Sequence, residues 1–175
     1  QFVYFDTGPE TGNIPVLFSL SNLPRKTGEK ASPNYRNIQS GYVIQFEHGY
    51  YAGGRGGGAA FDPEGKRVQT FKGDGGGAHA RNFIDAVKSR KRETLNAEIE
   101  VAHYSSSWCH LANVAYRLGQ SYSREKAESI AQSSAPWKEL LDGFQHHIEA
   151  NHVDLAQAGL KVSSILEVDP KREIF

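Results

Sequence analysis

The pattern of hydrophobic residues changes once along this chain, near residue 78, and that change limits the folds it can adopt. Before residue 78, short runs of β-branched and aromatic residues alternate with turn residues, as in strands joined by hairpins. After it, hydrophobic residues recur every three or four positions, as along one side of an α-helix. Strands in one half and helices in the other indicate an α+β fold with an antiparallel or mixed sheet.

The first half contains several short candidate strands. They lie at residues 2–5, 16–20, 42–46, 59–61 and 67–71. Between the last two, Asp62-Pro63-Glu64-Gly65 places proline second and glycine fourth, as type I turns prefer. We therefore predict a β-hairpin over residues 59–71.

The second half is predicted to contain three helices. The first has a hydrophobic stripe, and the basic residues at its C-terminal end suit the helix dipole. The stripe consists of Ala80, Phe83, Ile84 and Val87. The second helix extends from about residue 98 to residue 118 and ends at Gly119, a usual C-terminal stop. The third covers residues 136–150, and residues 160–168 are a last candidate strand.

Composition narrows the classes of function. A chain of 175 residues, 38% of them hydrophobic, is long enough for one domain with its own core. Lysine plus arginine and aspartate plus glutamate number 20 each, so no net field attracts nucleic acid or an anionic membrane. No hydrophobic run reaches the ~18 residues needed to cross a bilayer. We therefore expect neither nucleic acid nor a membrane as a partner.

Two further counts bear on the origin of the chain. Cys109 is its single cysteine, so an internal disulfide is excluded and the compartment, cytoplasmic or exported, stays open. The sequence starts at Gln1 and contains no methionine, so we expect it to be a piece of a longer protein.

Two glycine clusters are candidates for phosphate binding. Residues 73–78 satisfy the dinucleotide pattern G-x-G-x-x-G/A with Gly73, Gly75 and Ala78, and Glu93 follows at about the expected distance. A Rossmann unit, however, needs a parallel second strand that ends at this acid, whereas here another helix follows. We therefore favour a flexible connection between a strand and a helix, and we expect this chain alone to bind no cofactor.

The other cluster, residues 53–58, lacks the Lys-Ser/Thr ending of a P-loop. Its Arg55 could meet an anion in a backbone nest. A bulged strand with glycines at positive φ is the simpler interpretation.

The most informative segment is the predicted second helix, because residues 101–116 contain no Lys, Arg, Asp or Glu. We expect a helix without charged residues to be enclosed by protein on most sides. One side carries His103, His110 and Asn113, which would then either form a polar network inside the fold or border a substrate rich in hydroxyl groups. Both interpretations stay open, and these three residues are the candidates for substrate binding.

Metal and nucleophile chemistry fit this helix poorly. His103 and His110 are seven residues apart, about 10 Å along the axis, whereas histidines that share an ion on a helix are usually four apart. Residues 105–107 are serines inside a helix, without the G-x-S-x-G elbow of a hydrolase. Cys109 is expected to be an inert buried thiol. We therefore expect no metal site.

Several short motifs occur in an order that is typical of one enzyme family. They are His79-Ala80-Arg81-Asn82-Phe83-Ile84-Asp85, Leu95-Asn96-Ala97-Glu98, Cys109-His110-Leu111-Ala112-Asn113 and Tyr116-Arg117-Leu118-Gly119. In this combination the chain closely resembles the C-terminal domain of bacterial Gfo/Idh/MocA-type oxidoreductases, the glucose-fructose oxidoreductase and inositol dehydrogenase family. The likeness extends to residues 60–66 and 151–175 and covers nearly the whole chain.

This resemblance implies a mostly antiparallel or mixed open β-sheet with helices packed on one face. It implies that residues 1–175 form a single substrate-side and oligomerisation domain, and that an N-terminal Rossmann domain absent from this chain binds NAD or NADP. The catalytic lysine and the Asp–His pair of the family have no matching positions here, so no catalytic residue is transferred. We expect part of an NAD(P)-dependent oxidoreductase acting on a sugar or polyol, with subunits pairing through the sheet as a homo-oligomer.

Two other functions stay open. The chain could be a non-catalytic carbohydrate-binding or scaffolding protein that kept this domain alone, which predicts that the natural reading frame starts near Gln1. It could also be a stand-alone hydrolase that uses His103 or His110, which predicts activity in this chain alone.

Overall fold

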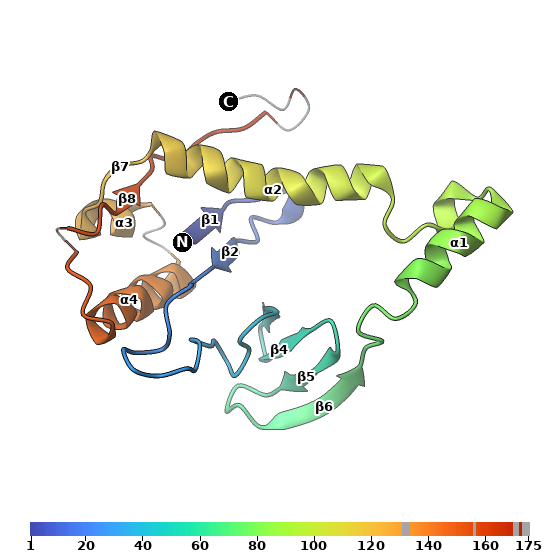
Figure 1. Ribbon diagram of the computed structural model, residues 1–175, viewed down its shortest axis with the longest axis horizontal. Coiled ribbons are helices and arrows are strands. Elements are labelled where there is room, and N and C mark those ends of the chain that lie inside the picture. Colours follow the sequence, from blue (N-terminus) through green and yellow to red (C-terminus); the bar gives the residue numbers. More distant parts are fainter. Residues whose placement is uncertain (131–133, 156, 170–171, 173–175) are drawn as a thin grey trace. The chain divides into compact units, whose positions relative to one another are not determined.

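The computed structural model describes residues 1–130, 134–155, 157–169 and 172 (Figure 1). The fold is α+β, with open antiparallel sheets and several helices, which confirms the predicted class. The chain divides into two compact units, one of Gln1–Ser32 with Ser105–Phe175 and one of Pro33–Tyr104. Each unit is described by itself.

The first unit contains two short β-ribbons and three helices. In chain order its elements are β1 (Phe2–Phe5), the 3-10 helix η1 (Pro9–Thr11), β2 (Val16–Ser19), α2 (Ile99–Leu118, from Ser105 on), β7 (Gln120–Ser121), α3 (Arg124–Ser129), α4 (Ala135–Ala150) and β8 (Lys161–Val162). Strand β1 pairs with β2, and β7 pairs with β8, both antiparallel. Of the strand predicted at residues 160–168, only β8 forms, because its partner β7 is two residues long.

Helices lie against both faces of the β1–β2 ribbon. Successive side chains of a strand point to opposite faces. Tyr4 accordingly contacts Trp137 of α4, with ring centroids 5.9 Å apart, while Phe5 contacts Trp108 of α2 at 4.8 Å. Here both faces of β1 are covered, because all four of its residues are aromatic or aliphatic.

The core of this unit forms where α3 meets α4. Ala127, Trp137 and Leu141 are each at most 4% exposed, and partly buried side chains from both ribbons pack against them. The indole Nε1 of Trp137 donates a 2.8 Å hydrogen bond to the carbonyl oxygen of Ala127, so its one polar atom has a partner. Trp137 therefore combines a large apolar contact with a bond that fixes its orientation.

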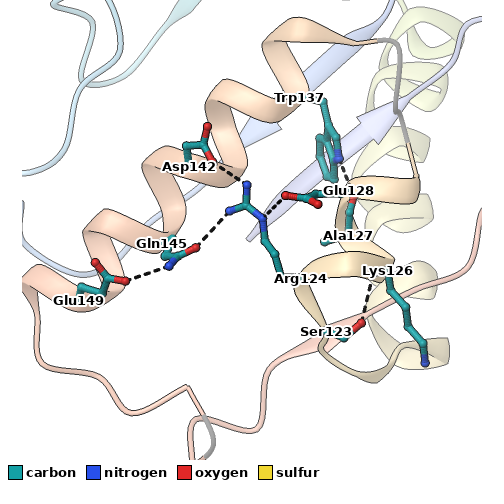
Figure 2. Close-up of polar contacts among 9 residues, drawn as sticks. All are labelled: Ser123, Arg124, Lys126, Ala127, Glu128, Trp137, Asp142, Gln145 and Glu149. Carbon is teal, nitrogen blue, oxygen red and sulfur yellow. Dashed lines mark hydrogen bonds and ion pairs between the residues drawn. The ribbon is translucent and has the colours of Figure 1, made fainter.

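Arg124 links the two helices on the outside of this core (Figure 2). Its guanidinium donates to Glu128 at 2.7 Å within α3, and to Asp142 at 2.6 Å and Gln145 at 3.3 Å on α4. Asp142, and after it Glu128, hold the pKa of Arg124 above its usual range. Ser123 begins α3 by accepting a hydrogen bond from the backbone N–H of Lys126.

Replacing Arg124 with alanine is expected to lower the free energy of unfolding by about 1 kcal/mol, since one side chain holds three partners in a partly exposed network. Urea denaturation followed by circular dichroism measures this. Lys126→Ala is the matched control, because its side chain points away from the network (Figure 2) and its loss should change stability by less than about 0.5 kcal/mol. Equal effects of the two substitutions would contradict a linking role for Arg124.

The second unit contains a four-stranded sheet followed by helix. Its elements are β3 (Tyr42–Phe46), β4 (Gly49–Gly54), β5 (Gly57–Phe61), β6 (Arg67–Lys72), α1 (His79–Ser89), the 3-10 helix η2 (Arg92–Thr94) and the first turns of α2. The strands are antiparallel in the order β3-β4-β5-β6, each paired with the next along the chain. The predicted hairpin over residues 59–71 is confirmed. Its turn is closed by a 3.0 Å bond from the N–H of Gly65 to the carbonyl oxygen of Asp62.

Helix α1 forms where its hydrophobic stripe was predicted. Phe83, Ile84 and Val87 on that stripe are 46–57% exposed. Asn82 fixes the chain that follows the helix, because its side-chain amide donates to Thr94 O at 2.7 Å and its Oδ1 accepts from Asn96 N at 2.9 Å. Among the described helices none is long and apolar enough to cross a bilayer.

Candidate functional site

Helix α2 carries the three residues that the sequence proposed for substrate binding. His103, His110 and Asn113 all lie in a continuous helix and are all exposed. His103 belongs to the second compact unit, and His110 and Asn113 belong to the first. Their role in binding a sugar stays a prediction.

The expected enclosure of α2 is wrong. None of its described side chains is buried, and Tyr116 and Leu118 are each 56% exposed. Cys109, predicted to be a buried thiol, is exposed as well. The reason is physical: serine, histidine and asparagine are neutral, but they also form hydrogen bonds with water. The absence of charge therefore does not require a protein partner.

The glycine-rich connection at residues 73–78 is occupied by a side chain of its own. The carboxylate of Asp74 accepts hydrogen bonds from the backbone N–H groups of Gly76, at 2.8 Å, and Ala78, at 3.1 Å. These are the amides at the start of α1 that a pyrophosphate would need. In this structure the two amides are paired within the loop, which connects β6 to α1 as predicted.

Because of these hydrogen bonds, we expect Asp74 to lose its proton at a lower pH than an ordinary aspartate. Hydrogen bonds from Gly76 and then Ala78 lower its pKa below the ordinary value of 3.8. The pKa of Asp74 is lower in the folded state than in the unfolded state. Ionised Asp74 therefore stabilises the fold fully above about pH 4, and this contribution is lost as pH falls through the folded-state pKa. Carboxyl chemical shifts in an NMR titration should give a midpoint for Asp74 below 3.8. A midpoint at or above that value would contradict the loop geometry.

The other glycine cluster forms a hairpin turn rather than the predicted bulged strand. Gly54 pairs with Gly57 across β4 and β5, so Arg55 and Gly56 are a two-residue loop. Arg55 donates from Nη2 to Gly75 O at 3.0 Å, and its own carbonyl accepts from Gly75 N at 3.0 Å. The two clusters therefore lie side by side, and the guanidinium of Arg55 contacts a carbonyl oxygen.

A hollow of about 390 Å³ lies on one face of the four-stranded sheet. Ala52, Ala59 and Thr70 stand in register on adjacent strands and contribute to its lining. Alanine on two central strands leaves room that larger residues would fill. The volume of the hollow falls within the ~300–1,000 Å³ of small-molecule sites, but the hollow is wide open to solvent, so it is a shallow depression and not an enclosed cavity.

An aromatic and cationic stack borders the hollow. The ring of Phe61, which lines it, stacks on Tyr50 with centroids 4.9 Å apart and planes 13° from parallel. The guanidinium of Arg36 lies over Tyr50, 4.3 Å from the ring centroid, and also 5.7 Å from the ring of Tyr35. Hydrogen bonding to Tyr35 is the first of the contacts that raise the pKa of Arg36. The aromatic rings thus position a cation at the rim.

The polar lining of the hollow is entirely basic or neutral. Arg36, Arg67 and Lys72 supply positive charge, and Asn37 and Thr70 supply neutral hydrogen-bonding groups. The described residues that line the hollow include no aspartate or glutamate. Every lining residue belongs to the second compact unit, Pro33–Tyr104. The arrangement can hold a ligand with hydroxyl groups and negative charge.

The sequence did not reveal this hollow. Its cations come from a polar loop and from the two ends of β6, and they meet because of strand register rather than through any short motif.

No group of three or more His, Cys, Asp or Glu side chains is arranged for a metal ion in the part of the chain that the structure describes. Comparisons of the chain with protein-family models, with curated proteins and with solved structures found no match.

Proposed function

We propose that this chain supplies the substrate side of an NAD(P)-dependent oxidoreductase that acts on a sugar or polyol. The observation that carries the proposal is the hollow on the four-stranded sheet, with Asn37, Thr70 and Arg67 as hydrogen-bonding groups beside the ring of Phe61. Sugars present hydroxyl groups at their edges and C–H groups on their faces, so they suit a lining that combines polar groups with an aromatic ring.

The glycine loop favours an enzyme in which one domain binds the substrate and another binds the cofactor. The hydrogen bonds from Gly76 and Ala78 to Asp74 favour a separate binding domain for a nicotinamide nucleotide. This agrees with the family resemblance, in which a Rossmann domain carries the cofactor. His103, His110 and Asn113 remain candidates for contact with the substrate, because their exposure leaves them accessible.

The sheet also offers a surface for pairing of subunits. Tyr42, Tyr51 and Phe71 form a row on the face opposite the Ala52–Ala59 pair, with neighbouring centroids 5.8 and 5.9 Å apart. Tyr42 and Phe71 are 51% and 43% exposed, and exposed aromatic rows of this kind mark interaction surfaces. We propose a homo-oligomer formed through this face, which sedimentation analysis tests directly.

The test of the proposed function is an assay of the longer protein that contains this chain. It should reduce NAD or NADP when offered a panel of sugars and polyols, as followed by the absorbance of the reduced nicotinamide. Failure to bind either nucleotide at millimolar concentration would contradict the proposal.

A non-catalytic carbohydrate-binding domain is the second candidate, favoured by the fact that the lining of the hollow lies within one compact unit. Its distinguishing result is sugar binding by the longer protein without any oxidation.

A further inference from the structure

We propose that the ligand of the sheet hollow is an acidic sugar, that is, a hydroxylated ring that also carries a carboxylate or a phosphate group. This inference rests on the proposed function and narrows its substrate class. It is carried by the charges around the hollow.

The balance of charge at the hollow differs from that of the chain. Lysine plus arginine equal aspartate plus glutamate over the whole sequence, at 20 each. The lining of the hollow, in contrast, has the three cations Arg36, Arg67 and Lys72 and no described carboxylate. Within residues 1–130, 134–155, 157–169 and 172, none of the three forms an ion pair, although arginines elsewhere in the same unit do. Three cations at one hollow without counter-charge favour an anionic ligand.

Arg36 is held in place before any ligand arrives. Its guanidinium lies 4.3 Å from the ring centroid of Tyr50, and Tyr50, 9% exposed, is itself fixed by stacking on Phe61. Hydrogen bonds to Tyr35 and Tyr50 use only part of the guanidinium's five N–H donors, and the remaining ones can match a carboxylate or a phosphate. Binding at this point loses little side-chain entropy.

The strand β6 carries the other two cations on either side of a neutral group. Arg67 and Lys72 are at its two ends, and Thr70 lies between them in register with Ala59. Such spacing offers positive charge at the ends of the hollow and a hydroxyl group near its middle. A sugar ring with an acidic substituent combines the matching groups, whereas inorganic phosphate has no ring for Phe61 to contact.

The experiment is calorimetric titration of the 175-residue chain with four probes: glucuronate, glucose 6-phosphate, glucose and inorganic phosphate. We expect glucuronate, glucose 6-phosphate or both to bind at least about tenfold more tightly than glucose and than inorganic phosphate, because a charge-assisted bond adds to the sugar contacts. Added salt should weaken that binding. The comparison of glucuronate with glucose 6-phosphate shows whether the acidic group is a carboxylate or a phosphate.

Substitutions then locate the binding. Arg67→Gln and Lys72→Gln should each weaken binding of the acidic sugar about tenfold, and Arg36→Lys should also weaken it because the fork is lost while the charge is kept. Lys88→Gln on α1 is the matched control, with the same change of charge in the same unit, and should stay within about twofold. Circular dichroism of each variant establishes that it folds.

Three results would overturn the inference. Equal affinity for glucose and the acidic sugars would show a neutral ligand, and equal affinity for inorganic phosphate would show recognition of the anion alone. Equal effects of Lys88→Gln and Lys72→Gln would place binding outside the hollow. Each of these results leaves the proposed oxidoreductase function standing, because that function is tested by cofactor reduction in the longer protein.

Discussion

Replacing Trp137 with alanine is expected to cost the first unit about 3–5 kcal/mol of unfolding free energy, as large aromatic truncations in a core do. Trp137 is 4% exposed, packs against Ala127 and Leu141, and meets Tyr4 edge to face. The substitution also leaves the carbonyl oxygen of Ala127 without its 2.8 Å bond. Much of the small core of this unit therefore depends on one side chain.

Urea denaturation of the wild type and of Trp137→Ala gives this difference. Phe83→Ala is the control, since Phe83 is 57% exposed and its truncation should change stability by less than about 0.5 kcal/mol. Trp137→Phe separates the two contributions, because it keeps most of the apolar contact and loses the hydrogen bond. A change below about 1 kcal/mol in Trp137→Ala would mean that the core has been placed wrongly.

Replacing Gly57 with alanine is expected to disrupt the four-stranded sheet, at a cost above about 3 kcal/mol. Gly57 has a φ of +105°, which side chains rarely adopt, and an added Cβ would overlap the carbonyl oxygen of Phe71 and lie 2.6 Å from Gly73 N. Both are backbone atoms of β6 or of the residues just after it, so the pairing of β5 with β6 must shift. The hollow should be lost with the sheet.

The neighbouring glycine provides the control for this prediction. A Cβ at Gly56 would meet nothing within 4 Å, so Gly56→Ala should leave stability nearly unchanged. Far-ultraviolet circular dichroism and amide hydrogen exchange of residues 49–72 report on the sheet. Equal stability of the two variants would contradict the register between β5 and β6.

The features that the sequence predicted well are those with local causes. The hairpin over residues 59–71 follows from turn chemistry within four residues, and α4 follows from a hydrophobic stripe and a proline near its start. Helix α3 was missed because its six residues are too few for a periodic pattern, although Ser123 at its N-cap was a usable signal.

The features that were not predicted from the sequence depend on contacts between residues that are far apart along the chain. The enclosure expected for α2 assumed protein neighbours on most sides, whereas the ring contacts of Trp108 are with the β1–β2 ribbon. The hollow needs residues 36, 67 and 72 to converge, and convergence depends on strand register. The composition gives the whole chain no net charge, but this average conceals the local excess of positive charge at the hollow.

The most direct test of where this chain binds ligands is an amide NMR titration of the 175-residue protein, performed once with an acidic sugar and once with NAD. We expect the acidic sugar to shift the resonances of Ala52, Ala59 and Thr70, and NAD to leave residues 73–78 unchanged. Shifts at Gly76 and Ala78 on addition of NAD, with none at the sheet on addition of the sugar, would contradict the account.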